Sequence, residues 1–158
     1  MPTRITATVD PARSRVEART TSDQLIAMDA DPPEGDDSAA GPKETLLAAL
    51  AGCTAMDVVS ILRKKRQVAT TYELAVSGES AEAHPRIFTV IRVEHRVSGA
   101  VEAEALRRSI ELSATQYCPV NAMLSAVARI EHRYRLTDAE GNEHEALVAV
   151  IGPGGGRD

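Results

Sequence analysis

The sequence predicts an α+β fold in which β-hairpins and helices occupy separate stretches of the chain. Two observations indicate this. Segments that alternate apolar and polar residues come in pairs, at the start, in the middle and at the end of the 158-residue chain. Helical stretches lie between these pairs and not between single strands, and such segregation is typical of α+β proteins rather than of doubly wound sheets.

The N-terminal third predicts short strands, a loop and one long helix. Residues 4–10 and 15–20 alternate in polarity and residues 25–28 follow a turn, which suggests two or three strands. Residues 29–42 are rich in Asp, Pro and Gly and predict a loop. A helix is expected from about Pro42 to Arg66, because Pro favours the first helical position and basic residues favour the last turn. Its middle is apolar on nearly every face, so other elements should surround it.

The middle of the chain predicts a hairpin followed by two helices. Residues 70–80 and 86–99 have the composition of strands and are close enough in sequence to pair. Residues 101–117 place their apolar side chains on one face of a helix. A further helix is expected over residues 119–128, with Pro119 at its first position.

The C-terminal part predicts a last hairpin and a tail. Residues 129–138 and 145–152 resemble strands and face each other across the turn AEGN. The chain length suits one domain. We therefore expect a single domain over residues 1–152 and a flexible tail over residues 153–158.

Composition and charge exclude several classes of function. The formal net charge is -5 and the charges are dispersed, which argues against nucleic acid as a partner. The N-terminus lacks the apolar core of a signal peptide, and no apolar run is expected to reach membrane-spanning length. We therefore expect a cytoplasmic protein without membrane association.

The histidines do not predict a metal site. None of the four histidines has the spacing of a metal-ligand motif, and two cysteines are too few for a zinc site on their own. His95 and His132 lie in strand-like segments, on the same face as their apolar neighbours. Both are expected to be satisfied core or surface residues, and neither a metal nor a cofactor is expected.

Cys118 directly precedes Pro119 and is a candidate reactive thiol. If Pro119 opens a helix, the sulfur of Cys118 caps that helix and faces its free N–H groups, a setting that lowers the pKa of a thiol. The alternative is a buried cysteine that acts as a small apolar residue.

Cys53 lies in the middle of the long helix, with Asp57 one turn further on. Burial and a neighbouring carboxylate both oppose a thiolate there, so any cation that activates Cys53 must come from the tertiary structure. Asp57 is expected to be a buried carboxylate paired with a backbone donor or an arginine. Two distant thiols at helical positions suggest a catalytic or sensing pair, in which one thiol is oxidised and the other resolves it as a disulfide.

The stretch GPKETLLAALAGCTAMDVVSIL, followed later by YCPV, resembles the OsmC/Ohr family of thiol-dependent hydroperoxide reductases, and CTAMDVVSILRKKRQ is closer to its less characterised OsmC-like branch. The resemblance implies an OsmC-like fold, with antiparallel sheets around two long central helices, and an intertwined homodimer. A partner chain would then cover the faces of the long helix that its own sheet leaves open.

The resemblance also implies an activity. Cys53 matches the peroxidatic thiol, which reacts with organic hydroperoxides, and Cys118 matches the resolving thiol, with which it forms an intramolecular disulfide. The implied reductant is a dithiol, such as a lipoylated protein or dihydrolipoamide. The alternative is a dimeric, non-enzymatic stress-related protein that binds a small hydrophobic ligand in the pocket between its subunits.

Two further residues match the family's site with departures. The family has a Glu directly after the Pro at the helix start, but here Lys43 follows Pro42 and Glu44 comes one step later. Glu44 could therefore serve its own Cys53 only if the helix breaks, or else serve the partner's site. Arg15 is the nearest match to the family's N-terminal arginine and Arg19 the second, although either could face solvent.

Overall fold

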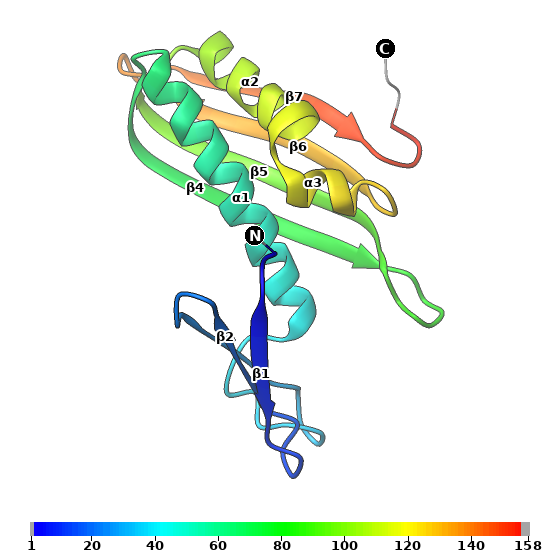
Figure 1. Ribbon diagram of the computed structural model, residues 1–158. Helices are drawn as coiled ribbons and strands as arrows, with labels where there is room; N and C mark the ends of the chain where they lie inside the picture. Colours follow the sequence, from blue (N-terminus) through cyan, green and yellow to red (C-terminus); the bar gives the residue numbers. More distant parts are fainter. Residues whose placement is uncertain (1, 156–158) are drawn as a thin grey trace. The chain divides into compact units, whose positions relative to one another are not determined.

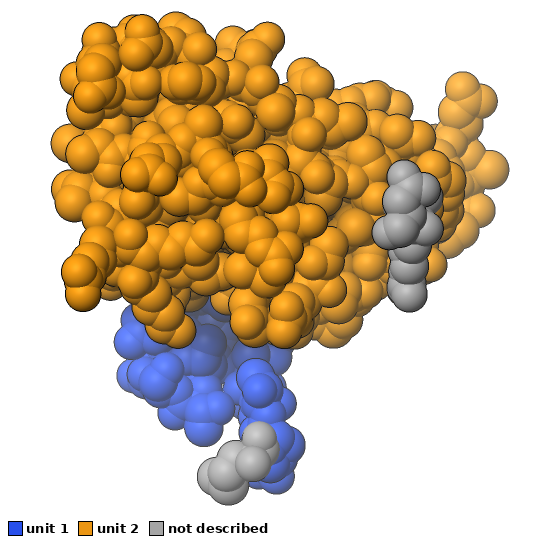
Figure 2. All heavy atoms as spheres, turned by 90° about the horizontal axis from the view of Figure 1, so that it is seen from above, with its two compact units in different colours: residues 1–46 blue, residues 47–158 orange. Residues whose placement is uncertain are grey.

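The computed structural model describes residues 2–155, and the chain divides into two compact units, residues 1–46 and 47–158 (Figure 2). The first unit contains an antiparallel sheet in the order β1-β2-β3, formed by β1 (Ile5–Val9), β2 (Val16–Thr20) and β3 (Leu25–Met28). These are the predicted N-terminal strands. The single domain over residues 1–152 stays a prediction, and residues 156–158 of the expected tail lie outside the described residues.

The loop that follows β3 is organised by the carboxylate of Asp29. Its oxygens accept hydrogen bonds from the hydroxyl and the N–H of Ser38, at 2.6 and 2.9 Å, and from the N–H of Ala30 at 2.8 Å. The bonds from Ser38 are the main reason that the pKa of Asp29 falls to about 2. Gly35 lies against this turn, where a Cβ atom would meet the carbonyl oxygen of Ala30 at 2.2 Å.

Helix α1 (Pro42–Lys64) begins and ends within two residues of the predicted positions. Its start is capped by Glu44, whose Oε2 accepts the N–H of Gly41 at 2.8 Å in the manner of a capping box. Its last turn carries Arg63 and Lys64, which suit the negative end of the helix dipole. The buried side chains of α1 recur every fourth residue and form one stripe: Leu50, Thr54, Val58 and Leu62.

The second unit is a four-stranded sheet with helices on one face (Figure 1). The strand order is β4-β5-β6-β7, and the helical elements are the part of α1 from Leu47 onward, α2, the π-helical turn η1 and α3. The bounds are β4 (Val68–Ser80), β5 (Phe88–Ala100), α2 (Ala103–Leu112), η1 (Ser113–Tyr117), α3 (Pro119–Leu124), β6 (Arg129–Thr137) and β7 (Glu143–Ile151). Alternate residues of β5 and β6 are buried under the helices, and the α+β class is as predicted.

Two expectations about this unit are wrong in detail. The sheets are not antiparallel throughout, because β5 pairs with β6 in parallel. A parallel pair needs a long crossover, and the chain supplies it as α2, η1 and α3. The helix predicted over residues 101–117 is also interrupted, since α2 ends at Leu112 and a π-helical turn follows. The second central helix is therefore a short helix, a π turn and a shorter helix.

A chain of buried hydrogen bonds crosses the core of the second unit. It joins the hydroxyl of Tyr72 to Nδ1 of His95 (2.7 Å), Nε2 of His95 to Nδ1 of His132 (3.3 Å), and Nε2 of His132 to Oδ1 of Asn121 (3.0 Å). His95, His132 and Asn121 have no exposed surface. Both histidines are thus satisfied core residues, one of the two placements that the sequence predicted.

Asn121, at the inner end of this series of hydrogen bonds, determines which atom is the donor in each of them. The side-chain amide of Asn121 donates to the carbonyl of Ala114 at 2.5 Å, so its oxygen must face His132. His132 then donates from Nε2 and accepts at Nδ1, His95 does the same, and Tyr72 donates at the outer end. Burial, reinforced for His95 by His132, lowers the pKa of His95 to about 3, and burial lowers that of His132 to about 4.

Helix α1 corrects a further expectation. By length and composition alone it is apolar enough to cross a membrane. The prediction that no apolar run reaches that length is therefore wrong at this helix. Only 22% of its most apolar stretch is buried within the chain, and the exposed apolar side chains include Met56, which is 75% exposed.

The buried histidines predict that acid destabilises the fold. Each is neutral in the folded state and has a pKa below the value near 6.5 of an unfolded chain, so its contribution to stability is complete above pH 6.5 and is lost as the pH falls. For His132 alone the loss reaches about 3 kcal/mol by about pH 4. Denaturant unfolding between these pH values measures it.

A matched pair of variants isolates this effect. His132→Gln should flatten the dependence of the unfolding free energy on pH, because one of the groups that binds a proton only when unfolded is gone. His84→Gln, at an exposed position, should leave the dependence unchanged. Equal slopes for the wild type and His132→Gln would contradict the assignment of His132 as a buried neutral histidine.

Candidate functional site

The two cysteines meet in the second unit, together with Asp57. The sulfur atoms of Cys53 and Cys118 and one carboxylate oxygen of Asp57 all lie within 4.8 Å of one another. Both thiols are free. Cys53 and Asp57 are neighbours on successive turns of α1, and Cys118 lies between η1 and α3. A disulfide requires a sulfur–sulfur distance of about 2.05 Å, so a modest local movement would join the two thiols.

Cys118 is the buried member of the pair, with 3% of its surface exposed. It caps α3 as predicted, and its sulfur accepts the N–H of Asn121 at 3.3 Å and the hydroxyl of Thr54 at 3.8 Å. These donors do not outweigh burial. Burial, followed by the interaction with Cys53, raises the pKa of Cys118 to about 11. The helix start does lower this pKa through the N–H of Asn121, but burial outweighs it, so the alternative of a buried cysteine is the one observed.

Cys53 is the more accessible thiol. It is half-buried, whereas Cys118 is almost completely enclosed. The residue before it, Gly52, leaves space on the helix surface, since a Cβ atom built there would meet none of the described atoms within 4 Å. A small molecule that enters the site from solvent therefore reaches the sulfur of Cys53 before that of Cys118.

Asp57 is held by a neighbouring hydroxyl. The Oγ of Ser113, the first residue of η1, donates to Oδ2 of Asp57 at 3.0 Å. The sequence predicted a backbone donor or an arginine for this carboxylate, and the donor observed is the serine. Ser113 has no exposed surface, so its hydroxyl is not in competition with bulk water for this bond.

The π-helical turn η1 is the feature that sequence reasoning missed. The N–H of Cys118 bonds to the carbonyl of Ser113 at 3.0 Å, five residues back, which closes the turn. The same turn presents the hydroxyl of Ser113 to Asp57 and the carbonyl of Ala114 to Asn121. Such turns within helices are frequent at functional sites. The sequence signal available was Pro119, which ends the helix before it but does not specify a π turn.

The other two candidate residues belong to the first unit. The guanidinium of Arg15 donates to the hydroxyl of Ser38 at 2.6 Å and lies 3.5 Å from a carboxylate oxygen of Glu17. Glu44 caps α1 through the N–H of Gly41. Arg19, the second choice, forms an exposed ion pair with Asp23 at 3.1 Å. Each of these side chains thus has a partner within its own unit.

The groups around the two thiols include types of ligand that bind metal ions. Thiolate and carboxylate groups bind zinc, and Cys53, Asp57 and Cys118 offer three such groups close together. A structural zinc site normally has four protein ligands, whereas a catalytic one keeps three and leaves one position open. The described residues around the thiols thus supply three donors, one fewer than a structural zinc site, and no fourth His, Cys, Asp or Glu among them completes the set.

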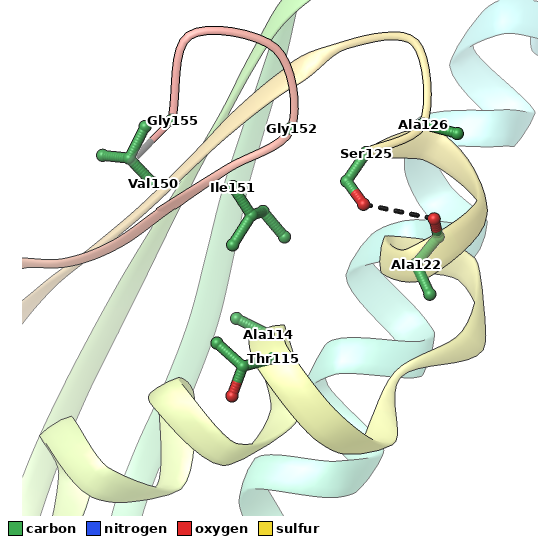
Figure 3. A pocket seen from close by; sticks show the side chains of 9 residues that line it. All are labelled: Ala114, Thr115, Ala122, Ser125, Ala126, Val150, Ile151, Gly152 and Gly155. Carbon is green, nitrogen blue, oxygen red and sulfur yellow. Dashed lines mark hydrogen bonds between the residues drawn. The ribbon is translucent and has the colours of Figure 1, made fainter. Parts of the chain in front are cut away.

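A separate pocket of about 690 Å³ lies at the other side of η1 and α3 (Figure 3). It is lined by small and apolar side chains: Ala114, Thr115, Ala122, Ser125, Ala126, Val150, Ile151, Gly152 and Gly155. Gly152 turns the end of β7 with a φ of +89°, and a Cβ atom there would meet the carbonyl oxygen of Ala128 at 2.2 Å. Among the described residues the lining includes no titratable side chain, so these residues offer volume but no acid–base or nucleophilic chemistry.

Comparisons with known proteins agree with this architecture. A family model described as "OsmC-like protein" matches residues 35–133. Protein YhfA of Escherichia coli strain K12 is 40% identical over 104 residues, which cover 65% of this chain and 78% of YhfA.

Two solved structures show the same fold. An OsmC-like protein of Mycoplasma pneumoniae superposes with a TM-score of 0.75 at 19% identity, covering 86% of this chain and 97% of that one. An organic hydroperoxide resistance protein OsmC of Legionella pneumophila superposes with a TM-score of 0.60 at 17% identity, covering 84% of this chain and 95% of that one. Since the family model matches more than half of the sequence, the chain belongs to the OsmC-like protein family.

Proposed function

We propose that the protein is a thiol-dependent peroxidase that reduces organic hydroperoxides. The observation that carries the proposal is the meeting of two free thiols of unequal exposure, with their sulfur atoms within 4.8 Å. An accessible thiol that is oxidised and an enclosed thiol that resolves it are the two parts that this chemistry needs. Similar folds in proteins named for organic hydroperoxide resistance support the same substrate class.

The roles of the two thiols follow from their surroundings. The thiolate of Cys53 attacks the outer peroxide oxygen, the O–O bond breaks, and the alkoxide leaves and takes up a proton to become an alcohol. Cys53 is then a sulfenic acid. Cys118 attacks the sulfur of Cys53, a disulfide forms, and water leaves. Cys118 suits the second role because it is too enclosed to meet a bulky hydroperoxide directly.

The cycle needs a reductant and support for the Cys53 thiolate. A dithiol, such as dihydrolipoamide or a lipoylated protein, would reduce the disulfide by exchange in the cytoplasm. Arg15 is the proposed cation beside Cys53, and Glu44 the proposed carboxylate that orients it. Both have partners in the first unit, so this role requires Arg15 to exchange its bonds to Ser38 and Glu17 for the active thiolate.

We further propose a homodimer. Beside Met56, α1 presents a groove of about 580 Å³ lined by Ala55, Met56, Val59, Ser60, Arg63 and Lys64. An apolar helix face of this kind is rarely left in contact with water, and a second copy of α1 would cover it. Lys64 and Arg63 at one end of the groove would then lie at the rim of the interface, where charged groups are tolerated.

A second candidate function is the binding of a small hydrophobic ligand without turnover. The pocket of about 690 Å³ favours it, because its volume suits a small ligand and its lining is mostly apolar. In that case both thiols would be core residues. Variants with Cys53→Ser or Cys118→Ser would then bind the ligand as the parent does.

Counting thiols tests the peroxidase function. One equivalent of cumene hydroperoxide should remove two thiols per chain within minutes from the reduced wild type. Cys118→Ser should lose one thiol and retain a sulfenic acid on Cys53, detected as a dimedone adduct by mass spectrometry. Cys53→Ser should lose none on that time scale, since Cys118 is enclosed and protonated. A wild type that keeps both thiols would reject the proposed function.

Removing the charge of Arg15 tests its support of the thiolate. Arg15→Ala should slow the oxidation of Cys53 by roughly 10- to 100-fold, because an opposite charge nearby lowers a thiol pKa by one to a few units. Stopped-flow measurement with excess hydroperoxide gives the rate. Arg19→Ala is the matched control, since it removes the same charge from β2, where Arg19 forms an exposed ion pair with Asp23, and its rate should be unchanged. Equal slowing by both variants would remove Arg15 from the site.

A charge on the groove of α1 tests the dimer. Met56→Asp should convert the dimer to a monomer in sedimentation experiments, because the carboxylate would be buried without a partner at the centre of the interface. Leu147→Asp is the matched control, as it places the same charge at a residue of β7 that is 52% exposed. A wild type that sediments as a monomer at all concentrations would contradict the proposal.

A further inference from the structure

In the resolving step of the proposed peroxidase, Cys118 must lose its thiol proton when it attacks oxidised Cys53. The nucleophile in disulfide formation is a thiolate, but burial keeps Cys118 protonated, with a pKa of about 11. At neutral pH the thiolate of Cys118 is therefore the minor form. A group beside Cys118 must therefore take its proton during the attack.

The groups around the sulfur of Cys118 indicate which of them can accept its proton. Thr54 and Asn121 present a hydroxyl and a backbone N–H, which donate to the sulfur and stabilise its anion. The histidine chain does not carry protons to the sulfur, because it ends in the side-chain amide of Asn121 and touches Cys118 only through a backbone N–H. Asp57 is the neighbour with a basic oxygen, and that oxygen is within 4.8 Å of both sulfurs.

We propose, given the peroxidase function above, that Asp57 is a catalytic residue which accepts the proton of Cys118 when this thiol attacks oxidised Cys53. Ser113 orients the carboxylate for this task through its bond of 3.0 Å to Oδ2. A separation of up to 4.8 Å closes through one bridging water or through the same local movement that joins the sulfurs.

The atoms and electrons balance. The proton of Cys118 passes to Asp57, and the electron pair left on sulfur forms the S–S bond. The S–O bond of the sulfenic acid breaks, its electron pair stays with the hydroxyl group, and the proton of Asp57 completes a water molecule. Cys53 and Cys118 end as a disulfide, Asp57 ends as a carboxylate, and no further reactant is needed.

The contacts of Cys118 support the same step. Burial, followed by the interaction with Cys53, raises the pKa of Cys118, so a base is needed for its attack. The donors on Thr54 and Asn121 stabilise the anion that forms when Asp57 takes the proton.

A test without peroxide separates this inference from the proposed function. An aromatic disulfide reagent converts the accessible Cys53 to a mixed disulfide and releases one coloured thionitrobenzoate, and the attack of Cys118 on this mixed disulfide then releases a second one. The attack needs the same deprotonation of Cys118, while its leaving group needs no proton. The rate of the second release is measured against pH for the wild type, Asp57→Asn and Asp57→Glu. Glu104→Gln, which changes a surface carboxylate, is the control. All assays contain a chelator, so that no zinc occupies the thiols.

Asp57→Asn should slow the release by roughly 100-fold, the lower end of the usual contribution of a general base. Its rate should also rise about tenfold per pH unit through neutrality, because only the spontaneous thiolate reacts, whereas the wild-type rate changes little. Asp57→Glu should recover most of the rate, and Glu104→Gln should match the wild type. A release rate for Asp57→Asn within threefold of the wild type would overturn the inference, and so would a slow rate with the wild-type pH dependence, which marks a purely structural role.

Discussion

The packing of helix α1 against the π-helical turn η1 is the constraint on which the site depends. Cys53 and Asp57 are fixed by the helical repeat of α1, and Ser113 and Cys118 by the five-residue closure of the turn. Their meeting requires α1 to present one face to this turn while its buried stripe stays on the sheet. A regular α-helical turn would rotate the residues that follow and separate Ser113 from Asp57 or Cys118 from Cys53.

Desolvation decides the electrostatics of this region more than charge does. The pKa of Cys118 is raised and those of His95 and His132 are lowered, in each case with burial as the largest cause. All three shifts favour the neutral form. The core between α1 and the sheet therefore holds titratable groups at neutral pH without holding their charges.

The sequence predicted those elements of the fold that depend on local residue patterns. Alternating polarity located β1, β2 and the later hairpins, and Pro42 with the basic residues after Leu62 located α1. The parallel pairing of β5 with β6 and the π turn were not predicted, since neither leaves a pattern in a single strand or helix. At the site, the sequence suggested the two thiols as a pair. It left a helix-cap thiol and a buried cysteine as alternatives for Cys118 and saw no positive role for Asp57, because burial and the hydroxyl of Ser113 arise only from tertiary packing.

The hydrogen-bond chain from Tyr72 to Asn121 restricts how this protein can evolve. Tyr72 donates the first bond, and His95, His132 and Asn121 each accept one bond and donate the next. Replacing any single residue therefore leaves a lone pair or a hydrogen without a partner, at a cost of about 1–3 kcal/mol. The four positions lie on β4, β5, α3 and β6, and a substitution at one of them changes what the others can tolerate. Replacement of the chain by apolar side chains would therefore have to include the whole set, because a partial set leaves buried polar groups without partners.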